Sequence, residues 1–189
     1  MRLSMLVWDL PLRLYHAALS VFLILAFATG LTHHPQWHLW TGYVLLGLGI
    51  WRAIWGVVGS ETARFPAFLV DPLRPLRRRG PDDEFGHAAA GGWLLPLTLL
   101  WLGVILLGAL LGWPAHEALS LGLLAMLGLH LVFVAAAAAR GEGPLRAIVT
   151  GKKKLPAARR APRRAGLGPA LLALAVALGI VTLILRWHT

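Results

Sequence analysis

Histidine is the residue type whose positions in this sequence point to chemistry. Of the eight histidines, four lie inside or at the mouth of long apolar segments: His16, His38, His116 and His130. An ionisable side chain within lipid is costly, so it usually faces other helices, where it has a partner or a function. A neutral imidazole is a good metal ligand. The absence of cysteine excludes disulfides, thiolate-ligated metals, iron–sulfur clusters and covalently attached c-type haem for this chain alone.

The spacing of these histidines predicts two separate binding levels. His116 and His130 are fourteen residues apart, so both project from nearly the same helix face, about 21 Å apart along the axis. One metal ion cannot span that distance, whereas two planar haems, one near each membrane surface, can each take one ligand from this helix. Matching depth in the membrane then pairs His16 with His130 in the inner half and His38 with His116 at the outer rim.

Two arginines are candidates for binding the haem propionates. Arg13 is close to His16 in the sequence, and Arg52 follows His38 by fourteen residues, which puts Arg52 at the level of the inner pair. A guanidinium binds a carboxylate through two hydrogen bonds at once. Arg52 is equally compatible with snorkelling to the membrane interface, because its segment ends a few residues later.

Each histidine also has a plainer interpretation. A single membrane histidine often forms only an interhelical hydrogen bond, and His38 and His116 can face water. The other four are expected at the surface, His33 and His34 in a turn, His87 at the interface and His188 in the tail. A quinone or metal contact at His33 and His34, and a propionate or quinone contact at His87, are the alternatives. The sorting of four histidines into two depth-matched pairs favours haem ligation.

Five apolar segments must position these side chains. With 58% hydrophobic and only 14% charged residues, the chain has too little polar surface for a water-soluble globule. We therefore expect an all-α integral membrane protein with about four or five transmembrane helices. Their expected ranges are about 10–31, 37–58, 91–113, 115–139 and 167–185. The first exceeds the roughly 7–15 apolar residues of a signal peptide and lacks a small-x-small cleavage site, so we expect a retained helix.

The distribution of basic residues predicts the orientation. Lysine and arginine number 18 against 8 acidic residues, and nearly all of them lie in the N-terminus and in segments 60–90 and 140–166, while the turns at 32–37 and 113–115 have none. Basic residues near helix ends stay in the cytoplasm, which predicts a multi-pass protein of the bacterial inner (plasma) membrane with a cytoplasmic N-terminus. Topology thus accounts for the basic excess, so no nucleic-acid binding is expected, and contact with anionic membrane lipid is compatible.

Residues for hydrolysis or phosphoryl transfer are not found in the sequence. It has no paired carboxylates, no nucleophile with an orienting base and no glycine-rich phosphate loop. We therefore expect a chain that carries electrons rather than one that transforms a substrate itself.

Several motifs resemble a known family. They are VWDLPLRLYH at 7–16, His38 with Gly42-Tyr43, Trp51-Arg52, Trp55-Gly56, Gly86-His87, Gly91-Gly92-Trp93, His116-Glu117, His130 and LRAIVTGK at 145–152. Together they resemble the bacterial cytochrome b561 family, which overlaps the b-type cytochrome subunits of nickel–iron hydrogenases. The resemblance covers about residues 5–153. The chain departs from the family pattern in its fifth helix and in the alanine-rich end of its fourth.

The resemblance implies a four-helix transmembrane bundle with two non-covalent haem b groups, whose axial ligands are His16, His38, His116 and His130. It also implies electron transfer between the quinone pool and a redox partner, such as a c-type cytochrome or a hydrogenase-like protein. The expected organisation is a cytochrome b561-like domain at 1–153, a basic cytoplasmic linker at 154–166 and an additional transmembrane helix at 167–189. The alternatives are a quinone-linked membrane oxidoreductase such as a superoxide oxidase, and a haem-free transporter or anchor. A homodimer also remains open.

Overall fold

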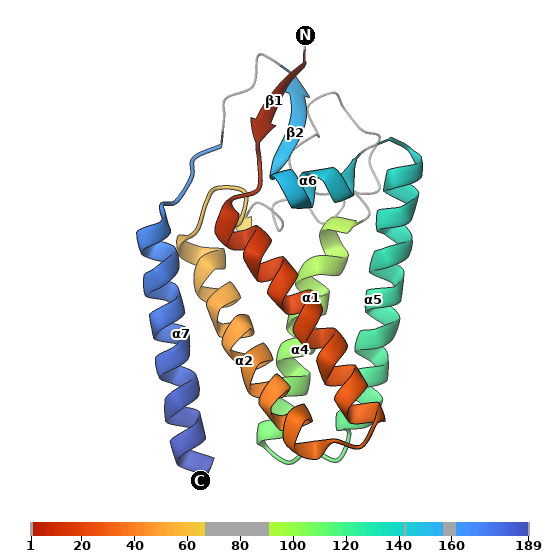
Figure 1. Cartoon of the computed structure of the whole chain (residues 1–189), viewed down its shortest axis with the longest axis vertical. Coiled ribbons are helices and arrows are strands. Elements are labelled where there is room, and N and C mark those ends of the chain that lie inside the picture. The colour runs from red at the N-terminus through yellow and green to blue at the C-terminus, as the bar shows by residue number, and fades with distance from the viewer. Residues whose placement is uncertain (1, 67–90, 142, 157–161, 189) are drawn as a thin grey trace.

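The computed structural model describes residues 2–66, 91–141, 143–156 and 162–188. The fold is mainly helical (Figure 1). Its helices are α1 (Leu10–Leu31), α2 (Pro35–Val58), α4 (Gly91–Leu110), α5 (His116–Ala139), α6 (Pro144–Thr150) and α7 (Leu167–His188), and its strands are β1 (Arg2–Leu6) and β2 (Lys152–Pro156). Each of the five apolar segments therefore contains a helix, with ends within a few residues of the expected ones.

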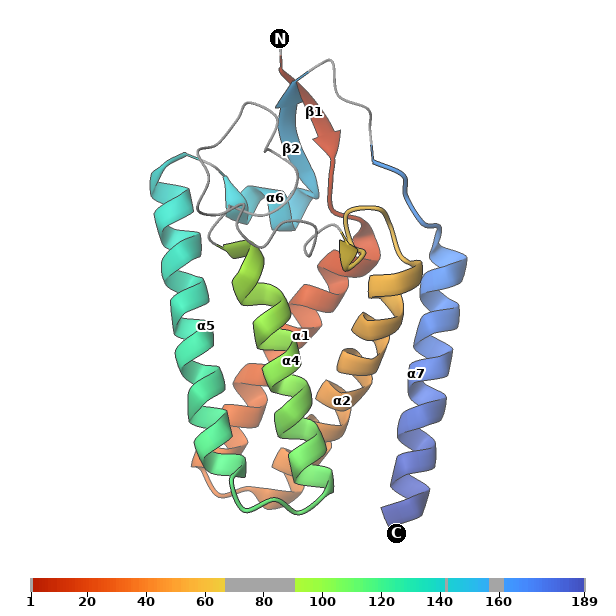
Figure 2. The ribbon, with the colours of Figure 1, turned by 180° about the vertical axis from the view of Figure 1, so that it is seen from behind.

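The five long helices run side by side and alternate in direction (Figures 1 and 2). The α1–α2 turn and the α4–α5 turn lie at one end, which we call the hairpin end, together with the C-terminus. The strands and α6 lie at the opposite end, which we call the ribbon end. His16 and His130 are thereby placed toward the ribbon end of their helices, and His38 and His116 at the hairpin end.

Within the described ranges, four helices are long and apolar enough to cross a membrane: α1, α2, α5 and, over Leu167–Trp187, α7. The apolar part of α4 in the described chain, Pro96–Leu110, is shorter. Most side chains of the four span candidates are not buried inside the protein, as expected for helices whose apolar surface faces lipid. The chain is thus an all-α membrane protein in its main architecture.

A two-stranded ribbon is an addition that the sequence reasoning did not predict. β1 pairs antiparallel with β2, and the register places Leu3 opposite Leu155 and Met5 opposite Lys153. β2 crosses the boundary expected between the membrane domain and the linker, so the chain continues in regular structure beyond residue 153. Pairing between segments so far apart in sequence leaves no local periodic pattern from which to predict it.

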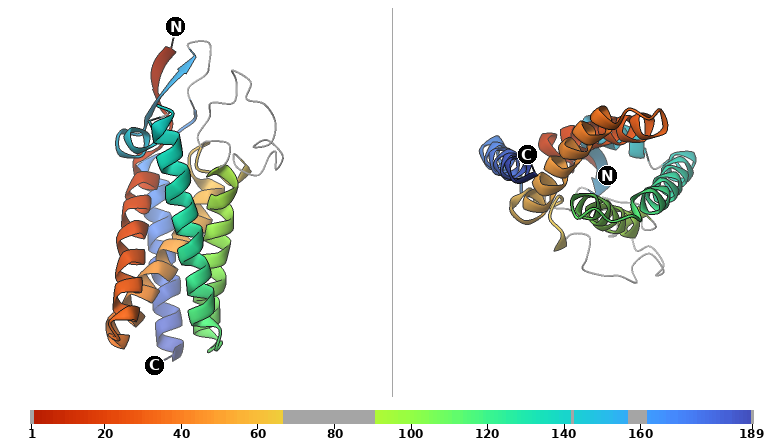
Figure 3. Two further views of the ribbon diagram at one scale, coloured as in Figure 1. Left: turned by 90° about the vertical axis from the view of Figure 1, so that its right-hand side faces the viewer. Right: turned by 90° about the horizontal axis from the view of Figure 1, so that it is seen from below.

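Two clusters of buried side chains hold the helices together. One contains Leu23, Leu45, Leu102, Ile105 and Leu123, and so joins α1, α2, α4 and α5. The other surrounds Trp55, whose side chain is fully buried, and joins the ribbon-end halves of α1 and α2 to α7. Seen along the helix axes, α7 lies outside the other four helices and against α2 (Figure 3).

The start of α1 is fixed by a cap and by a glycine joint. Asp9 caps the helix, and its Oδ1 accepts a hydrogen bond of 2.7 Å from the Leu12 amide, which satisfies one of the free N–H groups of the first turn. The Gly151 carbonyl accepts hydrogen bonds from the amides of Val7 and Trp8, at 2.7 and 3.1 Å. Gly151 itself has φ +73°, and it thereby connects the entry of α1 to the end of α6.

Alanine at Gly151 is expected to destabilise this joint. A Cβ there would lie 2.5 Å from the Trp8 carbonyl oxygen, in addition to the strain of positive φ. Gly141 is a matched control, because it has φ +74° and, among the described residues, no atom within 4 Å of its Cβ position. We expect Gly141→Ala to cost about 1–2 kcal/mol and Gly151→Ala clearly more, measured by thermal unfolding in detergent. Equal losses of stability in the two variants would contradict this role of Gly151 in connecting α1 to α6.

Candidate functional site

His38 and His116 face each other at the hairpin end. Their ring centroids are 5.8 Å apart and the ring planes are nearly perpendicular, at 84°. The two rings come from α2 and α5, and both side chains are half-buried. Each residue lies near the start of its helix, directly after a short turn, so the two turns bring them to the same height. The structure therefore brings together the two histidines that we predicted to pair because they lie at the same depth in the membrane.

The hydrogen bonds of these two rings differ. Nδ1 of His38 lies 2.9 Å from the Ala26 carbonyl oxygen on α1. Because a carbonyl oxygen only accepts, Nδ1 carries the proton and Nε2 keeps its lone pair. Nδ1 of His116 is buried and has no hydrogen-bond partner in the described chain. One imidazole of the pair is thus held in a defined tautomer, and the other has an unsatisfied polar atom.

His16 and His130 form the second pair, toward the ribbon end. They come from α1 and α5, both are half-buried, and they lie close enough for their charges to interact electrostatically. α5 thus contributes one histidine to each pair, as its fourteen-residue spacing predicts. Their pairing at the inner level stays a prediction.

The distance between the two rings of the hairpin-end pair is close to the distance expected across one bound metal ion. Bonds between a metal and imidazole nitrogen are about 2 Å long. Two rings bound to opposite sides of one metal therefore have centroids about 6 Å apart, which is close to the 5.8 Å separation of His38 and His116. Two opposed imidazoles are the axial ligand set of a bis-histidine haem, whose porphyrin fills the other four positions. In the described ranges, no group of three or more His, Cys, Asp or Glu residues is placed to hold a metal ion.

Arg13 lies one helical turn from His16, toward the ribbon end. Residues three apart on a helix share a face, so Arg13 projects on the same side of α1 as His16. Its Nη1 lies beside Gly151, and its Nε is buried with no hydrogen-bond partner among the residues that the structure describes. A buried donor in that state favours an anionic partner. The position suits the propionate of a group held by His16.

Arg52 has a different environment from the one its spacing suggested. It is 3% exposed, its Cζ lies 5.0 Å from the centroid of the Phe65 ring, and it interacts electrostatically with Asp9 and Tyr15. Snorkelling to an interface does not describe a side chain this deeply buried. Asp9 supplies an anionic neighbour from within the chain, so Arg52 fits a charge interaction between α2 and the start of α1.

The remaining histidines are not part of either pair, and His87 cannot be described. His33 and His34 are exposed in the α1–α2 turn, where His33 has a positive φ of 54°. This agrees with solvated turn residues. His87 lies outside the described residues, and only the backbone of His188 is described, at the end of α7.

A stack of aromatic rings beside the His16 level was not predicted from the sequence. Trp51 stacks on Tyr15 and on Trp55, with centroids 5.4 Å apart in both contacts. The Trp51 indole N–H also donates to the Ala170 carbonyl of α7, at 3.2 Å. The spacing of Trp51 and Trp55, one turn apart on α2, is the signal from which their stacking could have been predicted.

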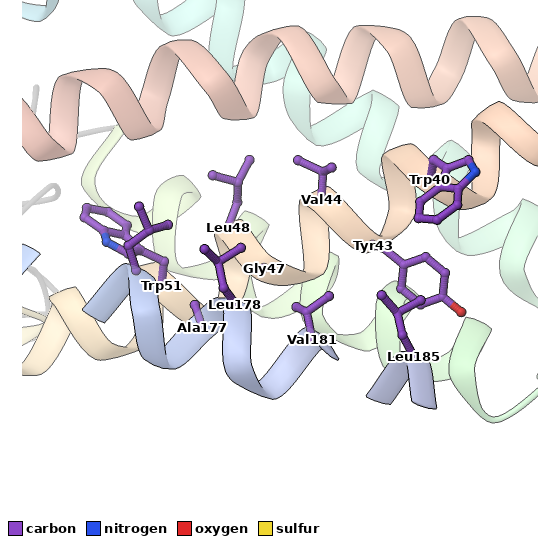
Figure 4. A pocket seen from close by; sticks show the side chains of 11 residues that line it. Trp40, Tyr43, Val44, Gly47, Leu48, Trp51, Ala177, Leu178, Val181 and Leu185 are labelled. Atoms are coloured by element: carbon purple, nitrogen blue, oxygen red, sulfur yellow. The ribbon is translucent and has the colours of Figure 1, made fainter. Parts of the chain in front are cut away.

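An apolar groove of about 270 Å³ separates part of α2 from α7 (Figure 4). Trp40, Tyr43 and Trp51 line it from α2, and Leu178 and Val181 line it from α7. None of the four paired histidines is among its lining residues. The groove therefore belongs to the contact between α7 and the bundle and not to the histidine sites.

Comparison with known proteins finds no match: no family model, no curated protein and no solved structure corresponds to this chain.

Proposed function

We propose that this chain is a di-haem b-type cytochrome similar to the bacterial cytochrome b561 family. It transfers electrons through the bacterial inner membrane between the quinone pool and a redox partner such as a c-type cytochrome or a hydrogenase-like protein. The observation that carries the proposal is the contact of His38 with His116, two imidazoles from separate helices that face each other 5.8 Å apart.

Each histidine pair holds one haem b in this proposal. His38 and His116 bind the haem at the hairpin end, and His16 and His130 bind the one at the ribbon end, where Arg13 binds a propionate. Support for the second site comes from the unsatisfied, buried Nε of Arg13, one helical turn from His16. Haem, when bound, supplies the one-electron chemistry. The chain contributes ring orientation, charge and burial, which set the reduction potential.

The membrane arrangement of the proposal has five spans. α4 is the third span and completes the four-helix bundle, and α7 is an additional span outside it. The ribbon end is cytoplasmic, because exposed basic residues gather there, among them Arg140, Arg146, Lys152, Arg163 and Arg164, and such residues are retained on the cytoplasmic side.

Haem content tests the proposal directly. We expect membranes containing the expressed chain to show a Soret band, and the purified protein to contain two haem b per chain by the pyridine haemochrome assay. His33→Ala/His34→Ala is the matched control, since both residues are exposed, and it is expected to retain both haems. A chain that inserts into membranes without a Soret band contradicts the proposal. Reduction of the purified protein by a quinol then tests the quinone partner.

A further inference from the structure

We propose that α1 acts as the seat of the His38 imidazole, with the Ala26 carbonyl and Gly30 fixing the tautomer and the orientation of the ring. Gly30 is then a positioning residue for the hairpin-end site, although it lies on a helix that supplies no ligand to that site. This inference deepens the proposed function and rests on it only where haem is measured.

The first part of the seat is the hydrogen bond from Nδ1 of His38 to Ala26, at 2.9 Å. It joins residues of two different helices, and its acceptor is a backbone carbonyl within α1. Such a bond makes the imidazole a stronger donor to a metal and fixes the direction of the opposite nitrogen. Nε2 of His38 is thereby left as the metal-binding atom.

The second part is the missing side chain at Gly30, one turn beyond Ala26. A Cβ at this position would lie 3.3 Å from both Nδ1 and Cε1 of His38. That distance is tighter than ordinary contact, so a Cβ at residue 30 requires the ring to shift by a few tenths of an ångström, and a larger side chain requires a larger shift. The absence of a Cβ therefore permits the approach on which the Ala26 hydrogen bond depends.

The two histidines of the hairpin-end pair differ in how their rings are held. His38 is held by a second helix, whereas Nδ1 of His116 has no hydrogen-bond partner in the part of the chain that is described. Their rings are nearly perpendicular, so a displacement of His38 alone changes the geometry of the pair. The structure thus assigns orientation of the site to His38 and its seat on α1.

Gly30→Val tests the seat, with Gly179→Val as the matched control. Gly179 lies in the apolar helix α7, and no atom of the residues that the structure describes lies within 4 Å of its Cβ position. In the haem-free protein, nitrogen NMR of labelled histidine should show His38 protonated at Nδ1, and Gly30→Val should lose that signal. In the haem-loaded protein, Gly30→Val should weaken retention of one haem about 10-fold or more and raise the midpoint potential of that haem alone.

The two measurements separate this inference from the proposed function. If the wild-type chain binds no haem, the proposed function fails. The tautomer of His38 in the haem-free protein then still tests whether α1 orients the His38 ring. Protonation of His38 at Nε2, or equal behaviour of Gly30→Val and Gly179→Val in both measurements, overturns the seat. Gly30→Ala provides a milder variant should Gly30→Val fail to assemble, and it is expected to shift the same signals by less.

Discussion

Substitution of His38 or His116 by alanine is expected to reduce the haem content from two per chain to one, and both variants should lack the same haem. The reason is that the two rings face each other across 5.8 Å, so removal of either ligand leaves one iron with a single protein bond. Pyridine haemochrome gives the content, and a redox titration identifies which haem is missing by its midpoint potential.

The complementary variants are His16→Ala and His130→Ala, which should each lose the other haem. Double variants within one pair should retain one haem, whereas double variants that combine the pairs should retain none. Loss of the haems in any other grouping contradicts the assignment of the pairs. The thermal stability of each variant, measured beside its haem content, identifies a chain that has simply failed to fold.

Substitution of Arg52 by methionine is expected to lower the stability of the protein. Arg52 is buried beside the Phe65 ring and interacts electrostatically with Asp9, which is itself 5% exposed. Removal of the guanidinium leaves the Asp9 carboxylate buried without that positive charge, and this is the source of the penalty. Thermal unfolding of the variant in detergent measures the loss.

The double variant Arg52→Met/Asp9→Asn is the control for this mechanism. Asparagine keeps a side-chain oxygen that caps α1 and removes the negative charge, so the double variant should recover part of the lost stability. No recovery contradicts the Asp9 interaction. A large change in the potential of the ribbon-end haem, with little loss of stability, instead supports the binding of a propionate by Arg52.

The positions of the long helices could be predicted from the sequence because each is an apolar segment bounded by charged residues, proline or glycine. α1 has the bounds expected for it, and α2 begins two residues earlier, at Pro35. The grouping of the four histidines followed from helix geometry and depth alone, and the structure shows a ring contact within one of the two pairs, between His38 and His116. Haem ligation by these residues stays a prediction.

Features that depend on contacts between distant residues could not be predicted. Arg52 was assigned by its position along α2, but its surroundings are set by how α1 enters the bundle at Asp9 and by the turn that carries Phe65. The hydrogen bond from His38 to Ala26 likewise requires the crossing of α1 and α2. Periodicity gives the face of a helix on which a residue lies, and only the packing gives its neighbour.

The pairing of β1 with β2 sets an order for assembly. β1 precedes the helices in the chain, and its partner strand follows about 150 residues later, so β1 can pair only after α1, α2, α4 and α5 have been synthesised. Contacts between segments so far apart form late, because a long loop must close first. The ribbon therefore forms late in folding, after the helices that carry the four paired histidines have been synthesised.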